Sequence, residues 1–353
     1  MNESREQEEN MNRRAFVAAG VGSLAASLAA APAPARIPVA LAGGSHSHAA
    51  AKALLFRDSP EWDLLGVWEE DPALRKKYES EKIKILSKDD VFNGPARVVA
   101  VEGPVKDHFA LSLKALESGK HVHAEKPPAD TLNGMRQLVE MARNKNLLLQ
   151  SGYMWRYHPG FDKIIEAKRN GWLGDVYMIR GQINTLIDAS RRPEWGMFKG
   201  GQMFELGAHL IDALVRLMGP PAKVTPFLRK QGAHKDELRD NTIAVFEYPN
   251  ALAVIQSVTL QPGAGSHRTF EVLGTNGTAV MRPLEAPVLH FDLAKPAGPY
   301  QKGNQNVPLP PYRRYEGDLA DLAAAVRGEK KLVVSLEQEL QVHQTLMAAS
   351  EMS

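Results

Sequence analysis

Residues 119–127 read Gly-Lys-His-Val-His-Ala-Glu-Lys-Pro, and this stretch decides how the rest of the chain is interpreted. The short run from Val122 to Ala124 predicts a strand, and Lys126 follows it within two residues. Lys126 is therefore expected at the carboxyl end of a strand, where parallel α/β sheets bind their ligands.

The surrounding sequence from residue 37 to residue 150 alternates strand-like and helix-like segments. Strands are expected at residues 37–42, 64–68, 97–101 and 122–124, and helices at 49–56, 72–79, 107–118 and 132–145. This alternation predicts an α/β domain of the Rossmann type over residues 36–150, with a doubly wound parallel sheet.

The pattern changes after Gln150. Segments rich in branched and aromatic residues lie at 175–185, 242–248, 251–261 and 268–273, with a hairpin turn at 275–278, and helices are expected at 160–170, 202–218, 316–327 and 336–349. Residues 151–353 are thus predicted to form an α+β substrate domain around a large, mostly antiparallel, open sheet.

Composition excludes several classes of function. The 353 residues carry a formal net charge of only +2 at pH 7, which argues against nucleic acid as the main partner. The chain has no cysteine, which excludes disulfides, thiolate metal sites and a cysteine nucleophile. Beyond the first 35 residues, no stretch is apolar and long enough to predict a membrane span.

The first 35 residues have the order of an export signal. Arg13 and Arg14 precede an apolar stretch from Ala15 to Ala31, and small residues surround the prolines that follow. The paired arginines predict export to the periplasm by the twin-arginine route, although Asn12 stands where that signal has Ser or Thr. The alternatives are an Ala-rich leader or a short membrane anchor.

The first predicted strand leads into a glycine turn that resembles a dinucleotide-binding loop. In Gly-x-Gly-x-x-Gly, backbone amides at a helix start hold the pyrophosphate, but Ser45 takes the second glycine position here and His48 the third. Glu69 ends the second strand, where an acid binds ribose hydroxyls and repels a 2′-phosphate, so NAD is expected rather than NADP. The alternative is a tight turn beside an exposed acidic corner. The candidates for cofactor binding are Gly43, Gly44, Ser45, His46 and Glu69.

His46 and His48 on this loop are also the residue type that binds metals. No third ligand lies nearby in the sequence, so no metal site is predicted there.

Glu205, His209 and Asp212 are spaced i, i+4 and i+7, which places them on one face of a helix. Oxidation of a secondary alcohol needs a base, and histidine suits that role near neutral pH. Lys126 would stabilise the developing alkoxide. The alternatives are a purely structural pair, or a metal site on the same helix face.

Three residues near the domain junction are candidates for substrate binding. Tyr153 can stack on a sugar ring, Arg156 can bind hydroxyls or carboxylates, and Trp195 could belong to a substrate lid. Asp212 joins this set, and packing of the junction is the alternative use of the aromatic residues.

With these motifs in place, the chain resembles the glucose–fructose oxidoreductase/inositol dehydrogenase (Gfo/Idh/MocA) family over nearly all of the sequence after the signal. The matching features are 119–127, 153–159, 170–174, Gly200-Gly201 with Glu205-x-x-x-His209-x-x-Asp212, and 274–278. The resemblance implies a Rossmann domain, a sheet domain that often forms homo-oligomers, and bound NAD(P). It also implies catalytic positions for Lys126 and His209.

The resemblance adds Gly103, Pro104 and His108 as the nicotinamide-side loop, and groups Glu125 with Lys126 as cofactor-binding. Two positions depart from the family pattern: Glu205 stands where Asp is usual, and Ser45 replaces the second glycine. The expected function is an exported NAD-dependent oxidoreductase that takes hydride from a secondary hydroxyl of a sugar, polyol or glycoside. The alternatives are glycoside cleavage by transient oxidation and elimination, and a non-catalytic sugar or nucleotide sensor.

Overall fold

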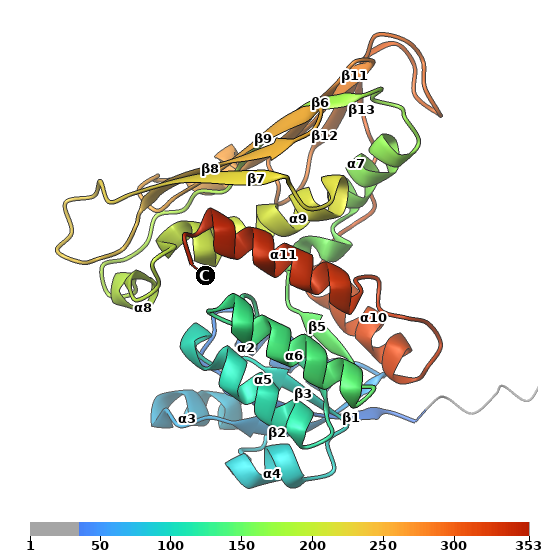
Figure 1. Cartoon of the computed structure of the whole chain (residues 1–353). Helices are drawn as coiled ribbons and strands as arrows, with labels where there is room; N and C mark the ends of the chain where they lie inside the picture. The colour runs from blue at the N-terminus through green and yellow to red at the C-terminus, as the bar shows by residue number, and fades with distance from the viewer. Residues whose placement is uncertain (1–34, 353) are drawn as a thin grey trace, which may run out of the picture. The chain divides into compact units, whose positions relative to one another are not determined.

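The computed structural model describes residues 35–352, which contain two sheets (Figure 1). The first sheet has five parallel strands in the order β2-β1-β3-β4-β5. Their bounds are β1 (Ile37–Ala42), β2 (Trp62–Trp68), β3 (Val98–Val101), β4 (His121–Ala124) and β5 (Leu149–Ser151). The predicted doubly wound parallel sheet is confirmed.

Helices on both faces of this sheet explain why its central strand β3 is wholly apolar: every residue of β3 is buried. The helices are α2 (Ala49–Asp58), α3 (Pro72–Ser80), α4 (Lys88–Asn93), α5 (His108–Glu117) and α6 (Leu132–Asn144). Polar side chains start several of them, since Asp71 caps α3 and Thr131 caps α6. The short α4 was not expected from the sequence; it begins with a capping box of Ser87 and Asp90.

The second sheet has eight strands in the order β13-β12-β11-β10-β6-β9-β8-β7. Only the β6–β9 pair is parallel, so the predicted, mostly antiparallel sheet is confirmed. The strands are β6 (Val176–Gln182), β7 (Lys223–Arg229), β8 (Asn241–Tyr248), β9 (Ala251–Val258), β10 (Thr269–Gly274), β11 (Gly277–Met281), β12 (Leu289–Leu293) and β13 (Gly303–Asn306). The predicted hairpin turn joins β10 to β11.

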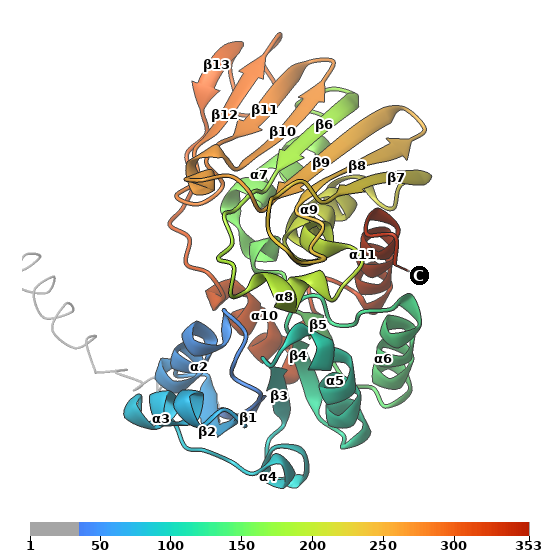
Figure 2. The same cartoon turned by 90° about the vertical axis from the view of Figure 1, so that its left-hand side faces the viewer.

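Helices cover one face of the second sheet, as Figure 2 shows for α7 (Pro159–Arg169) and α9 (Ala208–Met218). Alternate residues of β8 and β9 point into the core between sheet and helices, among them Phe246 and Ile255. None of the helices between residues 35 and 352 has the length and apolarity that crossing a membrane requires.

The last two helices connect the two sheets. Helix α10 (Glu316–Val326), assigned to the second domain from sequence, contributes Leu319 and Leu322 to the core cluster of β1 and β2. Helix α11 (Leu336–Ala349) contacts α6 of the first domain and α9 of the second (Figure 1). The predicted export signal lies outside the described residues.

Candidate active site

Lys126 and Glu205 form the contact that joins the carboxyl edge of the first sheet to the second domain. The Lys126 ammonium donates to the Glu205 backbone carbonyl oxygen at 2.9 Å and also to its carboxylate. Both side chains are buried. An ammonium held in this way has a fixed position beside whatever binds at the sheet edge.

Glu205 lies in a π-helical turn rather than in the regular helix expected from the sequence. The turn, η3, covers Met203–Gly207 and runs directly into α9. The predicted helix over 202–218 is therefore present, but its first turn is wider than an α-helical turn. Single π-helical turns occur often at functional sites because they redirect side chains.

His209 begins the regular part of this helix and is buried among aromatic rings. Its ring centroid lies 5.3 Å from that of Trp155, 6.1 Å from Tyr153 and 6.3 Å from His48. Burial and the nearby Lys126 ammonium lower the pKa of His209 well below its usual range, so the ring is neutral at pH 7. Its Nδ1 has no hydrogen-bond partner within residues 35–352, so this nitrogen is free to bond to a bound molecule.

Arg156 and Asp212, both predicted to bind substrate, belong to a buried ion network. The guanidinium of Arg156 donates to Asp212 at 2.8 and 3.0 Å and to Glu339 of α11 at 2.5 and 2.8 Å. Glu339 also accepts from the backbone N–H of Ser151. These bonds tie the short helix η2 (Met154–Tyr157) to α9 and α11, and contact of Arg156 or Asp212 with a substrate stays a prediction.

The other two substrate-binding candidates lie apart from each other in the core. Tyr153 is buried, with its ring next to His209 and the Arg156 guanidinium 4.8 Å from its centroid. Trp195 lies in α8 (Arg192–Gly196), where it packs with Ile187 and Leu238 in a separate small cluster. Tyr153 thus belongs to the surroundings of His209, whereas no contact links Trp195 to the Lys126–His209 group.

The loops after β1, β2 and β3 enclose a cavity of about 280 Å³ that suits the adenosine half of a dinucleotide. Five predicted residues line it: Gly43, Ser45, Glu69, Gly103 and Pro104. Gly43 has φ +81°, and a Cβ there would lie 2.5 Å from the Gly103 Cα, so the loops meet only because Gly43 has no side chain. The residues therefore fit a dinucleotide.

Two other predicted residues keep the cofactor loops in shape. The backbone N–H of Gly44 donates to the Glu69 carboxylate at 2.7 Å, which links the loops after β1 and β2. The His108 ring lies between the carbonyl oxygens of Gly103 and Pro127, at 3.0 and 2.8 Å, and is buried. His108 thus links the loop after β3 to the loop that carries Lys126.

A buried lysine that was not predicted from the sequence lies in α2, the helix that follows the glycine loop. Lys52 of α2 donates to Glu125 at 2.5 Å and to Glu102, at the end of β3, at 2.7 Å. Burial raises the pKa of Glu102 to about 8. Burial alone would raise the pKa of Glu125 too, but Lys52 and the nearby imidazoles hold it well below its usual range, so Glu125 balances the Lys52 charge. The sequence did offer one signal for this residue, because a lysine stands inside the Ala-rich segment 49–53.

Glu125 also completes a cluster with the two loop histidines. Its Oε1 lies 3.1 Å from Nδ1 of His48 and 3.9 Å from Nδ1 of His46. The prediction of no metal site rested on the lack of a third ligand nearby in sequence. The fold supplies one from 77 residues away, so that argument no longer holds.

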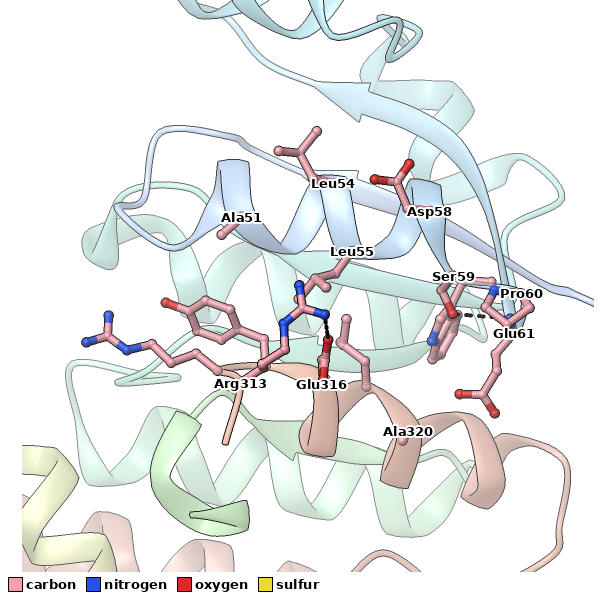
Figure 3. A pocket seen from close by; sticks show the side chains of 14 residues that line it. Ala51, Leu54, Leu55, Asp58, Ser59, Pro60, Glu61, Arg313, Glu316 and Ala320 are labelled. Carbon is pink, nitrogen blue, oxygen red and sulfur yellow. Dashed lines mark hydrogen bonds and ion pairs between the residues drawn. The ribbon is translucent and has the colours of Figure 1, made fainter. Parts of the chain in front are cut away.

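Another cavity, of about 910 Å³, lies between α2 and α10 (Figure 3). Leu54 and Leu55 approach it from α2, and Glu316 and Ala320 from α10. Tyr315 lines it too, and the Tyr315 ring centroid is 5.2 Å from that of His48. Lys126 and His209 are not among its lining residues, so the cavity is separate from the candidate active site.

Comparison with known proteins matches both domains to one family. Residues 37–153 match the oxidoreductase family with an NAD-binding Rossmann fold, and residues 161–280 match the GFO/IDH/MocA C-terminal domain. The chain belongs to the Gfo/Idh/MocA family. The resemblance seen in the sequence is thereby confirmed, including the NAD(P)-binding fold of the first domain.

Curated relatives of this family member match over part of their length. D-glucoside 3-dehydrogenase of Escherichia coli K12 is 34% identical over 134 residues, 35% of this chain and 36% of the relative. Trans-1,2-dihydrobenzene-1,2-diol dehydrogenase of Bos taurus is 27% identical over 175 residues, 49% of this chain and 50% of the relative. The alignments thus span about a third to a half of these relatives.

Solved structures of low identity share the fold over most of the chain. GenD2 from gentamicin A biosynthesis, in complex with NAD, has a TM-score of 0.74 at 21% identity and covers 90% of this chain and 93% of its own. Biliverdin reductase from Synechocystis, in complex with biliverdin and NADP+, has a TM-score of 0.75 at 18% identity and covers 89% and 98%. The fold therefore occurs with either cofactor.

Proposed function

We propose that this protein is an NAD-dependent oxidoreductase that removes hydride from a secondary hydroxyl of a sugar, polyol or glycoside. The observation that carries the proposal is the grouping of Lys126, Glu205 and His209 at the carboxyl edge of the parallel sheet. The cavity that suits the adenosine half of a dinucleotide lies at the same edge.

Each of the three side chains has a distinct part in such a reaction. The neutral His209 imidazole accepts the hydroxyl proton as the carbon loses hydride. The Lys126 ammonium stabilises the developing alkoxide, and Glu205 holds that ammonium in place. NAD, when bound, supplies the hydride acceptor. Because these groups are buried, the water that would otherwise compete for the proton is largely excluded.

Relatives and local charge support the substrate class and the cofactor. D-glucoside 3-dehydrogenase is named for a reaction at a sugar carbon, and it matches a third of this chain. The Glu69 carboxylate, which already binds the Gly44 N–H, would lie against a 2′-phosphate and repel it. We therefore propose NAD over NADP.

The first test is to purify the protein without added cofactor, denature it and measure the nucleotide released. Reduction of added NAD is then followed with a panel of glucosides, polyols and free sugars. Nucleotide binding with substrate-dependent NADH formation is the expected result. A protein that neither retains nor binds NAD contradicts the proposal.

The two alternatives give different results in the same assay. Release of an aryl leaving group from an aryl glycoside, without net NADH formation, would indicate cleavage by transient oxidation and elimination. Binding of NAD and sugar without any turnover, unchanged in His209→Ala, would indicate a sensor.

We also propose that the outer face of the eight-stranded sheet joins two copies of the chain. The register of β6, β9 and β8 places Met178, Leu252, Val254 and Val245 on the face away from α7 and α9. Leu252 is 44% exposed, and Phe227 of β7 is 48% exposed on the same face. Light scattering should show a dimer or larger species that Leu252→Asp dissociates, whereas Val333→Asp, at an exposed site outside the sheet, should not.

A further inference from the structure

We propose that His46, His48 and Glu125 form a binding site for a late first-row divalent cation, Zn²⁺ first among them. The site combines the loop after β1 with the end of β4, and it lies beside the Lys126–His209 group. Three observations support it: the spacing of the donor atoms, the orientation of the imidazoles, and the groups that hold Glu125.

The donor atoms are spaced as a cation of this size requires. One donor atom from each of the three residues can be chosen so that all lie within 4.8 Å of one another. The shortest separation is 3.1 Å, between Nδ1 of His48 and Oε1 of Glu125. Tetrahedral Zn²⁺ with bonds of about 2.0–2.2 Å places its ligand atoms about 3.3 Å apart, so small side-chain rotations close the triangle.

The ring of His46 already presents a lone pair to the cluster. Its Nδ1 accepts the backbone N–H of His48 at 3.3 Å, so this nitrogen carries no proton. The bond is long for a hydrogen bond and can give way to a metal bond. His46 is buried and the His48 side chain is 13% exposed, so a cation could enter from the His48 side.

Neighbouring groups hold the Glu125 carboxylate in place by hydrogen bonds. Metal ligands in proteins are held in the same way. Oε2 of Glu125 accepts from Lys52 and its Oε1 from the backbone N–H of Lys126 at 3.0 Å. Glu125 follows directly after β4, so its backbone is set by the sheet. The acceptor atom that faces the histidines is thus held in place before any ligand binds.

The charges around the cluster balance without a cation, and this limits the affinity of the site for a cation. Lys52 and Lys126 oppose a second positive charge, and the carboxylates of Glu125 and Glu205 offset them. An alkali or magnesium ion, which binds weakly, would not break these ion pairs, and Mg²⁺ prefers oxygen ligands. Two imidazoles and one carboxylate favour Zn²⁺ or Fe²⁺ instead.

Three protein ligands leave a coordination position for water or for an oxygen of a bound molecule, which is the pattern of catalytic zinc sites. The ring of His48 lies 6.3 Å from the ring of His209. A small molecule bound at the open coordination position would therefore also reach His209, the proposed base. A bound cation would therefore contribute a Lewis acid or an anchoring point next to the hydroxyl chemistry.

The test uses the full chain purified without a polyhistidine tag, stripped with chelator and titrated with Zn²⁺ against a chromophoric zinc indicator. Elemental analysis of the protein before stripping gives the metal and its stoichiometry. We expect about one Zn²⁺ per chain, with affinity reduced at least tenfold in His46→Gln and in His48→Gln. His234→Gln, which removes an exposed histidine elsewhere, is the matched control and should bind as the parent does.

Circular dichroism of each metal-free variant shows whether it has folded, so a loss of binding is counted only for folded protein. One Zn²⁺ per chain that survives in the folded double variant His46→Gln/His48→Gln would overturn the site, as would a parent chain that binds none. Fe²⁺ recovered in place of Zn²⁺ would support the site and change the metal. Nucleotide content is measured on the same samples, so a failed metal site and a failed oxidoreductase proposal are told apart.

Discussion

The ammonium of Lys126 donates to both the backbone carbonyl and the carboxylate of Glu205, a residue 79 positions later in the chain. This pair links the end of β4 to the π-helical turn that precedes His209. The catalytic proposal therefore depends on a contact between domains, and each domain alone holds only part of the site.

Lys126→Met should reduce kcat about 100- to 1,000-fold, because it removes the cation expected to stabilise the alkoxide. Dinucleotide binding, measured by titration of protein fluorescence, should change little, since the cavity is lined by other loops. Lys120→Met, on the same loop-and-strand segment but bonded to the Gly94 carbonyl, is the control and should retain kcat. Equal kcat in Lys126→Met and the parent would remove Lys126 from the mechanism.

Arg156→Leu should lower the free energy of unfolding by about 3–5 kcal/mol, because Asp212 and Glu339 would be left buried without their counter-charge. Urea denaturation followed by circular dichroism measures this change. The surface pair of Lys163 and Glu166 provides the comparison, since Lys163→Leu removes an ion pair in water and should cost well under 1 kcal/mol. Similar losses in the two variants would contradict the structural role of Arg156.

Gly43→Ala should weaken NAD binding, because its Cβ would push the loop after β1 away from Gly103. Gly119→Ala is matched to it: Gly119 also has positive φ, at +75°, but a Cβ there meets nothing within 4 Å. Both variants should lose about 1–2 kcal/mol of stability from the left-handed backbone, and only Gly43→Ala should lose nucleotide affinity. Calorimetric titration with NAD separates the two effects.

Asp318 should make the protein less stable as the pH rises from about 4 to about 7. Burial raises the pKa of Asp318 to about 7, against the opposing effect of Lys52, so the folded chain binds this proton more tightly than the unfolded chain does. The stabilising contribution is complete below the unfolded pKa and is lost as the pH approaches 7. Besides Lys52, the titratable and charged groups that act on Asp318 include Glu125, Arg156 and Glu102.

Asp318→Asn removes this titration, so the difference in unfolding free energy between variant and parent should shift in favour of the variant across that pH range. Urea denaturation at several pH values gives the difference directly. A difference that stays constant with pH would show that Asp318 is ionised throughout.

We propose export from the paired arginines, and the substitutions Arg13→Lys and Arg14→Lys test it together. In a Gram-negative host with a twin-arginine system, fractionation should recover the parent chain in the periplasm and the double variant in the cytoplasm. Export of both forms would point to a different route, and retention of both would contradict the proposal.

The local sequence was sufficient to predict the two-sheet architecture and to name several residues of the candidate site. Alternating apolar segments predicted the parallel sheet because secondary structure follows short-range periodicity, and Lys126, Glu69 and His209 stood next to recognisable strand ends or helix starts. The loop glycines were found for the same reason. The β-rich second domain was predicted as a class, although β7, β11, β12 and β13 were not located as strands.

Only the tertiary structure decided which charged side chains meet. Lys52 reaches Glu125 across 73 residues, and Arg156 reaches Glu339 across 183 residues. No periodicity encodes such pairs: buried charges need partners, but the sequence does not say which carboxylate will be nearest. For that reason the ion network of Arg156 and Asp212 was not predicted, and the third member of the His46–His48 cluster was not found. The local sequence pattern determined where the edge of the parallel sheet lies. Long-range packing determined which charged side chains and imidazoles meet at that edge.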